Sequence, residues 1–193
     1  MDQLQTDHLK AYGIAFWTLK KGEEVDWLLN YRGGSFLINY DSILERELKI
    51  RGVYYELVNT AILTEIFAQI EENNMDMVLL EKLPKIAVYS PPDKQPWDDA
   101  VTLALNYAEV DYETLWDEEV HRGELADYDW LHLHHEDFTG QYGKFYATFK
   151  NATWYKEQKV LYEQLAIKLG FNKVSKEKLS VSIKIKEFII GGG

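Results

Sequence analysis

The chain has 193 residues, of which 46% are hydrophobic and 14% aromatic, so it is long and apolar enough to bury a substantial core. Its formal net charge of −11 argues against a nucleic-acid partner, because binding phosphates requires a basic surface. The chain has no cysteine, which excludes disulfides, zinc–thiolate centres, iron–sulfur clusters and thiol nucleophiles built from this chain alone.

The sequence also bounds the membrane and compartment expectations. No run of apolar residues approaches the roughly 20 that a spanning helix requires, so we expect no integral membrane segment. No secretory leader is recognisable at Met1, although a mature exported protein would have lost its leader. As written, the sequence predicts a cytoplasmic protein and leaves export open, and it does not determine the oligomeric state.

The first part of the chain switches repeatedly between helical and extended hydrophobic periodicity. Helices are predicted at 9–22, 42–52 and 60–72, and strands at 25–31, 53–58 and 75–80, while residues 36–38 either extend the first strand or form a second one. The segment Arg32-Gly33-Gly34-Ser35 is typical of a tight turn. A guanidinium at the end of a strand could also bind an anion, so Arg32 is a candidate substrate-binding residue.

A second unit is predicted to begin after Pro84, which divides the chain into 1–84 and 85–193. A short apolar strand there runs into a proline-rich loop, and Pro96 suits the first turn of a following helix. The expected elements are strands at 85–90, 112–116 and 127–134, and helices at 96–108, 153–169 and 175–189. Strands that alternate with amphipathic helices predict an α/β fold with a parallel sheet covered on both faces.

The final three glycines are interpreted as a helix C-cap that leads into a further strand beyond Gly193. The alternative is an engineered glycine tail.

In open parallel sheets, ligands bind beyond the carboxyl ends of the strands, and two loops are predicted there. The first, Ser90–Asp99, places Lys94 and the backbone around Trp97 and Asp98 beside a helix N-terminus, which favours an anion or a carboxylate. The alternative is that Asp98 and Asp99 only complement the helix dipole.

The second loop follows the segment Trp130-Leu-His-Leu-His-His-Glu-Asp. His132 is expected to be a hydrogen-bonded histidine within the sheet. His134, His135 and Glu136 fall at the carboxyl end of the strand and could transfer protons near neutral pH, so they are the candidate catalytic residues. The substrate-binding candidates that follow them are Asp137, Thr139 and Gln141. Neither a metal nor a cofactor is predicted, because no further motif with ligand spacing is present.

Four stretches resemble a known family: HLKAYGIAFW, VDWLLNYRGGSF, LPKIAVYSPPDKQPWDDAVTLAL and DWLHLHHEDFTGQYGKFY. The resemblance is to a bacterial family labelled asparagine synthetase B, and it covers nearly the whole chain. Members of that family look like class I glutamine amidotransferase or trehalose-utilisation-type α/β domains. The resemblance therefore implies a flavodoxin-like three-layer sandwich with a mostly parallel sheet, and a thiol amidohydrolase site in full-length relatives, with the cysteine beyond Gly193.

This chain departs from the pattern that the family label implies. It has no cysteine, and it has no P-loop or pyrophosphate-binding motif for an ATP-dependent synthetase. The leading prediction is a glutamine-amidotransferase-like protein that binds a small-molecule substrate and lacks its own nucleophile. The alternative is a non-catalytic ligand-binding or protein-interaction domain, since a fold alone does not define a function.

Overall fold

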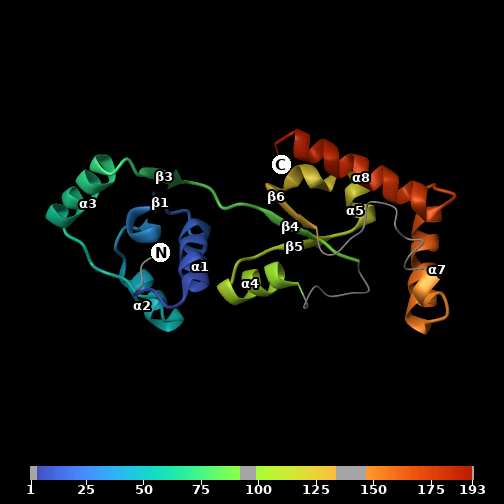
Figure 1. Cartoon of the computed structure of the whole chain (residues 1–193), viewed down its shortest axis with the longest axis horizontal. Helices are drawn as coiled ribbons and strands as arrows, with labels where there is room; N and C mark the ends of the chain where they lie inside the picture. Colours follow the sequence, from blue (N-terminus) through green and yellow to red (C-terminus); the bar gives the residue numbers. More distant parts are fainter. Residues whose placement is uncertain (1–3, 92–98, 134–146, 193) are drawn as a thin grey trace. The chain divides into compact units, whose positions relative to one another are not determined.

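The computed structural model describes residues 4–91, 99–133 and 147–192 (Figure 1). The chain divides into two compact units, which are described separately. Unit 1 comprises Met1–Leu83 and Leu103–Asp111, and unit 2 comprises Pro84–Thr102 and Tyr112–Gly193. One division between the units therefore falls inside a helix, α4 (Ala100–Ala108).

Unit 1 contains a small sheet with three helices. Its elements are α1 (His8–Lys20), β1 (Val25–Leu29), η1 (Tyr31–Gly33), β2 (Ser35–Leu37), α2 (Ser42–Arg51), α3 (Thr60–Glu72) and β3 (Asp76–Leu80). The helices begin where short polar side chains cap them. Asp7, Asp41 and Asn59 accept hydrogen bonds from the first-turn amides of α1, α2 and α3.

The sheet of unit 1 is antiparallel, with the order β2-β1-β3, so the predicted parallel sheet is wrong for this unit. The reason lies in the connection between β1 and β2. Asn30 and Arg32 have φ of 64° and 50°, and two glycines with positive φ follow them. Such a tight turn returns the chain at once, and only antiparallel strands can be joined this way.

The strand predicted at 53–58 is also absent, because that segment pairs with no described strand. Val53 is nevertheless buried and packs with Ile14 and Leu44. Val58 packs against a second hydrophobic cluster, so the two valines of the segment serve core packing rather than a sheet, whereas Tyr54 and Leu57 are exposed. Both edges of β1 are already occupied, so this segment has no place beside the central strand of the sheet.

Helix α1 packs closely against the end of α4 within unit 1. A Cβ atom built on Gly13 would lie 1.9 Å from the carbonyl oxygen of Ala108. Side-chain contacts support the same approach, since Lys10 Nζ lies 2.7 Å from Glu109 Oε1 and Tyr107 donates to Asp7. Gly13 thus permits two backbones to meet where no other residue fits.

Unit 2 is built around a parallel sheet of three strands in the order β5-β4-β6. Its elements are β4 (Ile86–Tyr89), the first turn of α4, β5 (Glu113–Leu115), α5 (Asp117–Arg122), η2 (Glu124–Asp127), β6 (Trp130–Leu133), α7 (Thr153–Lys168) and α8 (Val174–Ile190). The predicted α/β class is therefore confirmed, with a small parallel sheet in this unit. Within the described residues, no helix has the length and apolar character needed to cross a membrane.

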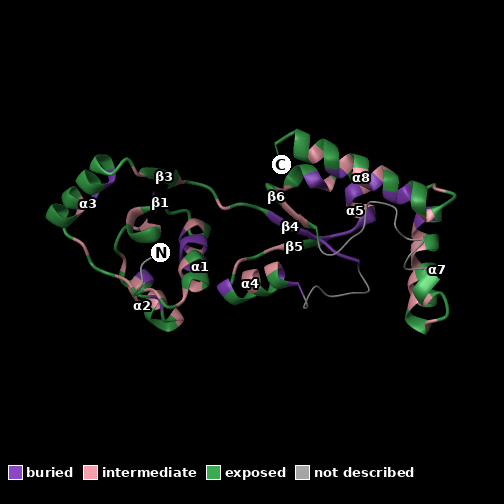
Figure 2. Ribbon diagram, in the orientation of Figure 1, coloured by how far each residue is buried: buried purple, intermediate pink, exposed green. Residues whose placement is uncertain are grey.

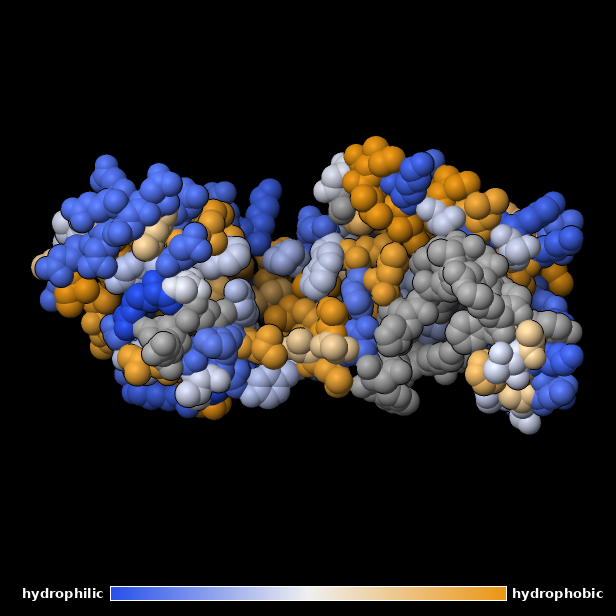
Figure 3. Space-filling view, in the orientation of Figure 1, coloured by the Kyte–Doolittle hydropathy of each residue, from blue (hydrophilic) through white to orange (hydrophobic). Residues whose placement is uncertain are grey.

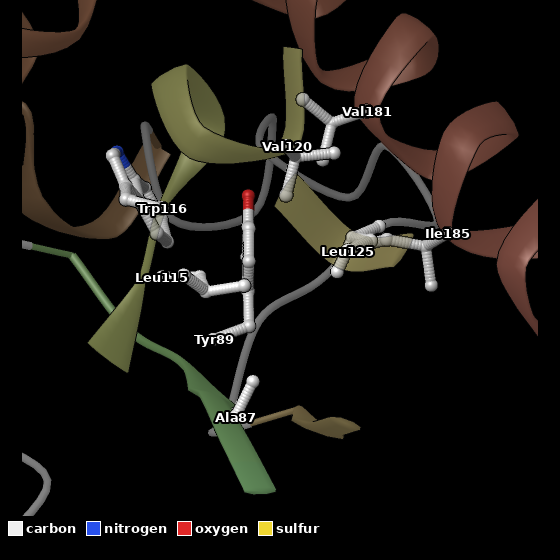
Figure 4. Close-up of a cluster of buried hydrophobic side chains, with 8 residues drawn as sticks. All are labelled: Ala87, Tyr89, Leu115, Trp116, Val120, Leu125, Val181 and Ile185. Carbon is white, nitrogen blue, oxygen red and sulfur yellow. The ribbon is translucent and has the colours of Figure 1, made fainter. Parts of the chain in front are cut away.

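The core of unit 2 lies between the sheet and helices α5 and α8 (Figures 2 and 4). Ala87 and Tyr89 of β4 point into it, and all four residues of β4 are buried. The other members of this cluster are Leu115, Trp116, Val120, Leu125, Val181 and Ile185. A strand buried on both faces reads as a continuous apolar run, which is why the sequence identified β4.

The approach at Gly13 gives a stability prediction. Gly13→Ala places a methyl group in the space of a backbone carbonyl, so we expect a loss of roughly 1–3 kcal/mol or more, as found for overpacking. This loss outweighs the gain of about 1 kcal/mol that alanine brings to a helix interior. Denaturant unfolding followed by circular dichroism measures it. The control is Ala61→Gly at an exposed position of α3, which should cost only the helix propensity, and a stabilised Gly13→Ala would contradict the assigned contact.

Candidate functional site

The carboxyl ends of β4 and β6 lie side by side in unit 2. The strands pair in parallel from Ile86 with Trp130 to Tyr89 with Leu133. The carboxyl ends of both strands therefore lie at the same end of the sheet. The predicted parallel pairing of these two strands is confirmed, and the histidine-rich and proline-rich residues that follow them lie outside the described residues.

Most of the predicted site residues lie outside the described residues. These are Lys94, Trp97, Asp98, His134, His135, Glu136, Asp137, Thr139 and Gln141. The site is therefore built from its described base, which is formed by the ends of the strands and the cap of α4.

Arg32 lies in unit 1, in η1. Its guanidinium forms two hydrogen bonds with Glu56, from Nη1 to Oε2 at 3.1 Å and from Nη2 to Oε1 at 3.2 Å. The Tyr54 hydroxyl also donates to Glu56 Oε1, at 2.8 Å. The arginine that was predicted to bind an anion thus has a carboxylate partner within the chain.

His132 is held at the sheet edge by a buried carboxylate. Its Nε2 lies 3.0 Å from Asp99 Oδ2, which confirms the expected hydrogen-bonded histidine of the sheet. The Asp99 side chain is 8% exposed and that of His132 is 18% exposed, so the imidazole keeps a limited opening to solvent. A carboxylate that contacts one imidazole nitrogen orients the ring and selects the position of its proton.

Asp99 also caps α4. Its Oδ1 accepts hydrogen bonds from the amides of Val101 and Thr102, at 2.8 and 2.9 Å. Thr102 is fully buried, and its hydroxyl donates to the Asp99 carbonyl at 3.1 Å. One carboxylate therefore fixes both the beginning of α4 and the imidazole of β6.

A second polar cluster lies on the opposite face of β4. Lys178 of α8 approaches both oxygens of Asp117, at 2.8 and 2.9 Å, and its Nζ lies 3.1 Å from the Tyr89 hydroxyl. Tyr89 in turn donates to Asp117. The side chains of Lys178 and Asp117 are 3% and 2% exposed, so this ion pair is removed from water.

Aromatic rings surround the ammonium of Lys178. Its Nζ lies 3.5 Å from the ring centroid of Trp116 and 5.2 Å from that of Tyr162. These cation–π contacts are strongest when the ion is desolvated, as it is here. The carboxylate and the rings together offset the cost of removing this ammonium group from water.

Sequence reasoning missed this cluster. Lys178 lies three and seven residues before Val181 and Ile185, so it occupies the buried stripe of its helix. A lysine at such a position, together with an aspartate directly after a strand, was the available signal. Neither residue has the motif spacing that drew attention to the histidines.

The described residues hold no group of three or more His, Asp or Glu side chains arranged to bind a metal ion. The Asp99–His132 pair is a hydrogen-bonded carboxylate–imidazole pair rather than part of such a group. The Lys178–Asp117 pair is too deeply buried for direct contact with a solute.

The chain was compared with protein-family models, with curated proteins and with solved structures, and none of them matches it.

The buried ion pair gives a prediction with a matched control. Lys178→Met leaves Asp117 buried without its counter-charge, so we expect a loss of roughly 3–5 kcal/mol in the free energy of unfolding of unit 2. Lys168→Met removes an exposed lysine that pairs with the neighbouring Glu118, and this should have little effect.

The double variant Lys178→Met/Asp117→Leu should recover part of the loss, because no buried charge then remains unpaired. Chemical denaturation of the three variants measures these differences. Equal effects of the two single lysine variants would contradict the assigned pairing.

Proposed function

We propose that unit 2 is an amidotransferase-like small-molecule-binding domain whose site lies at the carboxyl edge of β4 and β6. The observation that carries this proposal is the Asp99–His132 pair, a partly exposed imidazole oriented by a buried carboxylate at that edge. Ligands of parallel α/β sheets bind beyond the carboxyl ends of the strands, where loops can supply polar groups around a rigid base.

The segments that leave this edge carry the other proposed groups. His134, His135 and Glu136 directly follow β6, and Lys94, Trp97 and Asp98 belong to the segment that leaves β4. In this proposal the histidines and Glu136 exchange protons with the ligand, and Lys94 attracts its anionic group. Asp137, Thr139 and Gln141 add hydrogen-bonding groups from the same segment.

The proposed ligand class is a small amino acid that carries a carboxylate and a carboxamide, of which glutamine is the example. The family resemblance supports this class, and the imidazole at the sheet edge is a suitable partner for an amide or a carboxylate. Because the chain has no cysteine, its own residues can bind such a ligand and exchange protons with it but cannot form a thioester with it.

The test is a titration of the protein, labelled with ¹⁵N-histidine, with glutamine, asparagine, glutamate or aspartate. We expect at least one of these to shift the His132 ring resonances in a saturable manner. His132→Gln retains a donor for Asp99 but loses the imidazole, so it should weaken binding about tenfold or more, equivalent to at least ~1.4 kcal/mol. His8→Gln, at an exposed position of α1, is the control and should bind as the wild type does.

The absence of any saturable shift at millimolar ligand would contradict the proposal. Equal affinities of wild type and His132→Gln would contradict the role of His132. Either result would favour the alternative of a non-catalytic domain that interacts with other ligands or with proteins.

A further inference from the structure

Two buried polar atoms face each other between α5 and α8. His121 Nε2 and Glu177 Oε1 have no hydrogen-bond partner among the described residues, and they lie 3.5 Å apart. Their side chains are 13% and 2% exposed. Buried polar atoms are almost always satisfied, so two unsatisfied atoms at this distance require an explanation.

A single proton on Glu177 Oε1 would satisfy both atoms once they approach from 3.5 Å to hydrogen-bonding distance. A carboxylic acid donates an O–H, and a neutral imidazole accepts it when its own proton lies on Nδ1. Burial, together with the charge of Lys184, lowers the pKa of His121, so its imidazole is neutral at pH 7. Burial, the charge of Asp117 and a side-chain hydrogen bond with Asp117 raise the pKa of Glu177 to about 8, against the opposing effect of Lys178.

We propose that a proton held on Glu177 fastens α8 to α5, and that loss of this proton in mildly alkaline solution loosens the contact. The His121–Glu177 contact would then act as a pH-dependent switch on α8, the helix that covers the sheet of unit 2. This inference is independent of the proposed ligand, because it concerns the opposite face of β4 from His132.

The charges around Glu177 explain why deprotonation loosens the contact. Asp117 and His121 face it from α5, and Lys178 follows it on α8. Lys184, on the same helix, acts through its charge on His121. When Glu177 ionises, two buried carboxylates share the single cation of Lys178, and the excess negative charge is relieved only by admitting water.

The His121–Glu177 contact adjoins the cluster of polar side chains at the carboxyl end of β4. Lys178 and Asp117 hold the Tyr89 hydroxyl, and Glu177 is the neighbour of Lys178 on the first turns of α8. Opening the α5–α8 contact would therefore admit water to the polar end of the core, next to Trp116. The remainder of α8, anchored by Val181 and Ile185, would keep its apolar contacts.

The pH window follows from the direction of the shift. A carboxyl whose pKa is raised in the folded state contributes stability that is present below its unfolded value of 4.5 and is lost as pH rises to about 8. His121 has its pKa lowered from 6.5, so its contribution changes only below that value. Between pH 7 and 9 the effect of Glu177 is therefore isolated from that of His121.

The experiment is hydrogen exchange at pH 6.5–9.5, corrected for intrinsic exchange rates, on the whole chain. In the wild type, protection of α5 and of the first turns of α8 should fall by up to about tenfold per pH unit and level off above about pH 8. Glu177→Gln retains the donor and cannot ionise, so its protection should not vary with pH. Glu187→Gln, at an exposed position of the same helix, should behave as the wild type does.

A direct titration keeps the test independent of the variants. Carbon-detected NMR of the glutamate carboxyl groups should show one resonance with a midpoint near pH 8, which Glu177→Gln removes. The proposal is overturned if every glutamate of the wild type titrates below pH 6. It is equally overturned if Glu177→Gln loses protection with pH as the wild type does.

Discussion

Strand β4 is buried on both faces and paired with another strand along both edges. The arrangement of unit 2 follows from this constraint. Its four residues are 5% exposed or less, and it pairs with β5 on one side and β6 on the other. Its backbone groups are satisfied only if both neighbours stay in register, since an unpaired buried amide or carbonyl is costly. Because all three strands are parallel, their carboxyl ends lie at the same end of the sheet.

Alternate residues of a strand point to opposite faces of the sheet, and this alternation separates the two polar clusters of unit 2. Val88 pairs with His132, so the imidazole lies on the face where Asp99 caps α4. Tyr89 points to the opposite face, towards Asp117 and Lys178. A shift in register of one residue would exchange these faces, and the buried core of β4 opposes such a shift. The partly exposed Asp99–His132 pair and the buried Lys178–Asp117 pair thus lie on opposite faces of β4.

The helical side of unit 2 shows a different use of buried charge. Figure 3 shows apolar side chains along α8, but its inner stripe carries Glu177 and Lys178 among the valine and isoleucine residues. The lysine is balanced by the carboxylate of Asp117 and by aromatic rings. Among the described residues, no cation pairs with Glu177 alone, and in our proposal a bound proton neutralises its carboxyl group instead. Two ionisable side chains at adjacent positions of one helix are therefore accommodated differently, since Lys178 pairs with a carboxylate whereas burial raises the pKa of Glu177.

Local patterns in the sequence were sufficient for most helices and for the strands of unit 2. Asp41 and Gly52 mark the two ends of α2, and Asn59 marks the beginning of α3. The apolar run of β4 can be recognised without knowing which strands pair with it. These features depend on capping, on left-handed glycines and on periodicity, all of which act within a few residues. The alternation of strands and helices also predicted the parallel sheet and the position of His132.

Only the tertiary structure decided which strands pair and which charges are buried. The first sheet is antiparallel, and residues 53–58 form no strand, because pairing depends on segments far away in the chain. The partnership of Asp99 with His132 spans 33 positions, and that of Asp117 with Lys178 spans 61. No spacing rule connects residues so far apart. The sequence alone determined the apolar and capping patterns of the individual elements, and the packing of the helices on the sheet determined which polar groups are buried together, because burial makes an unpaired charge too costly to tolerate.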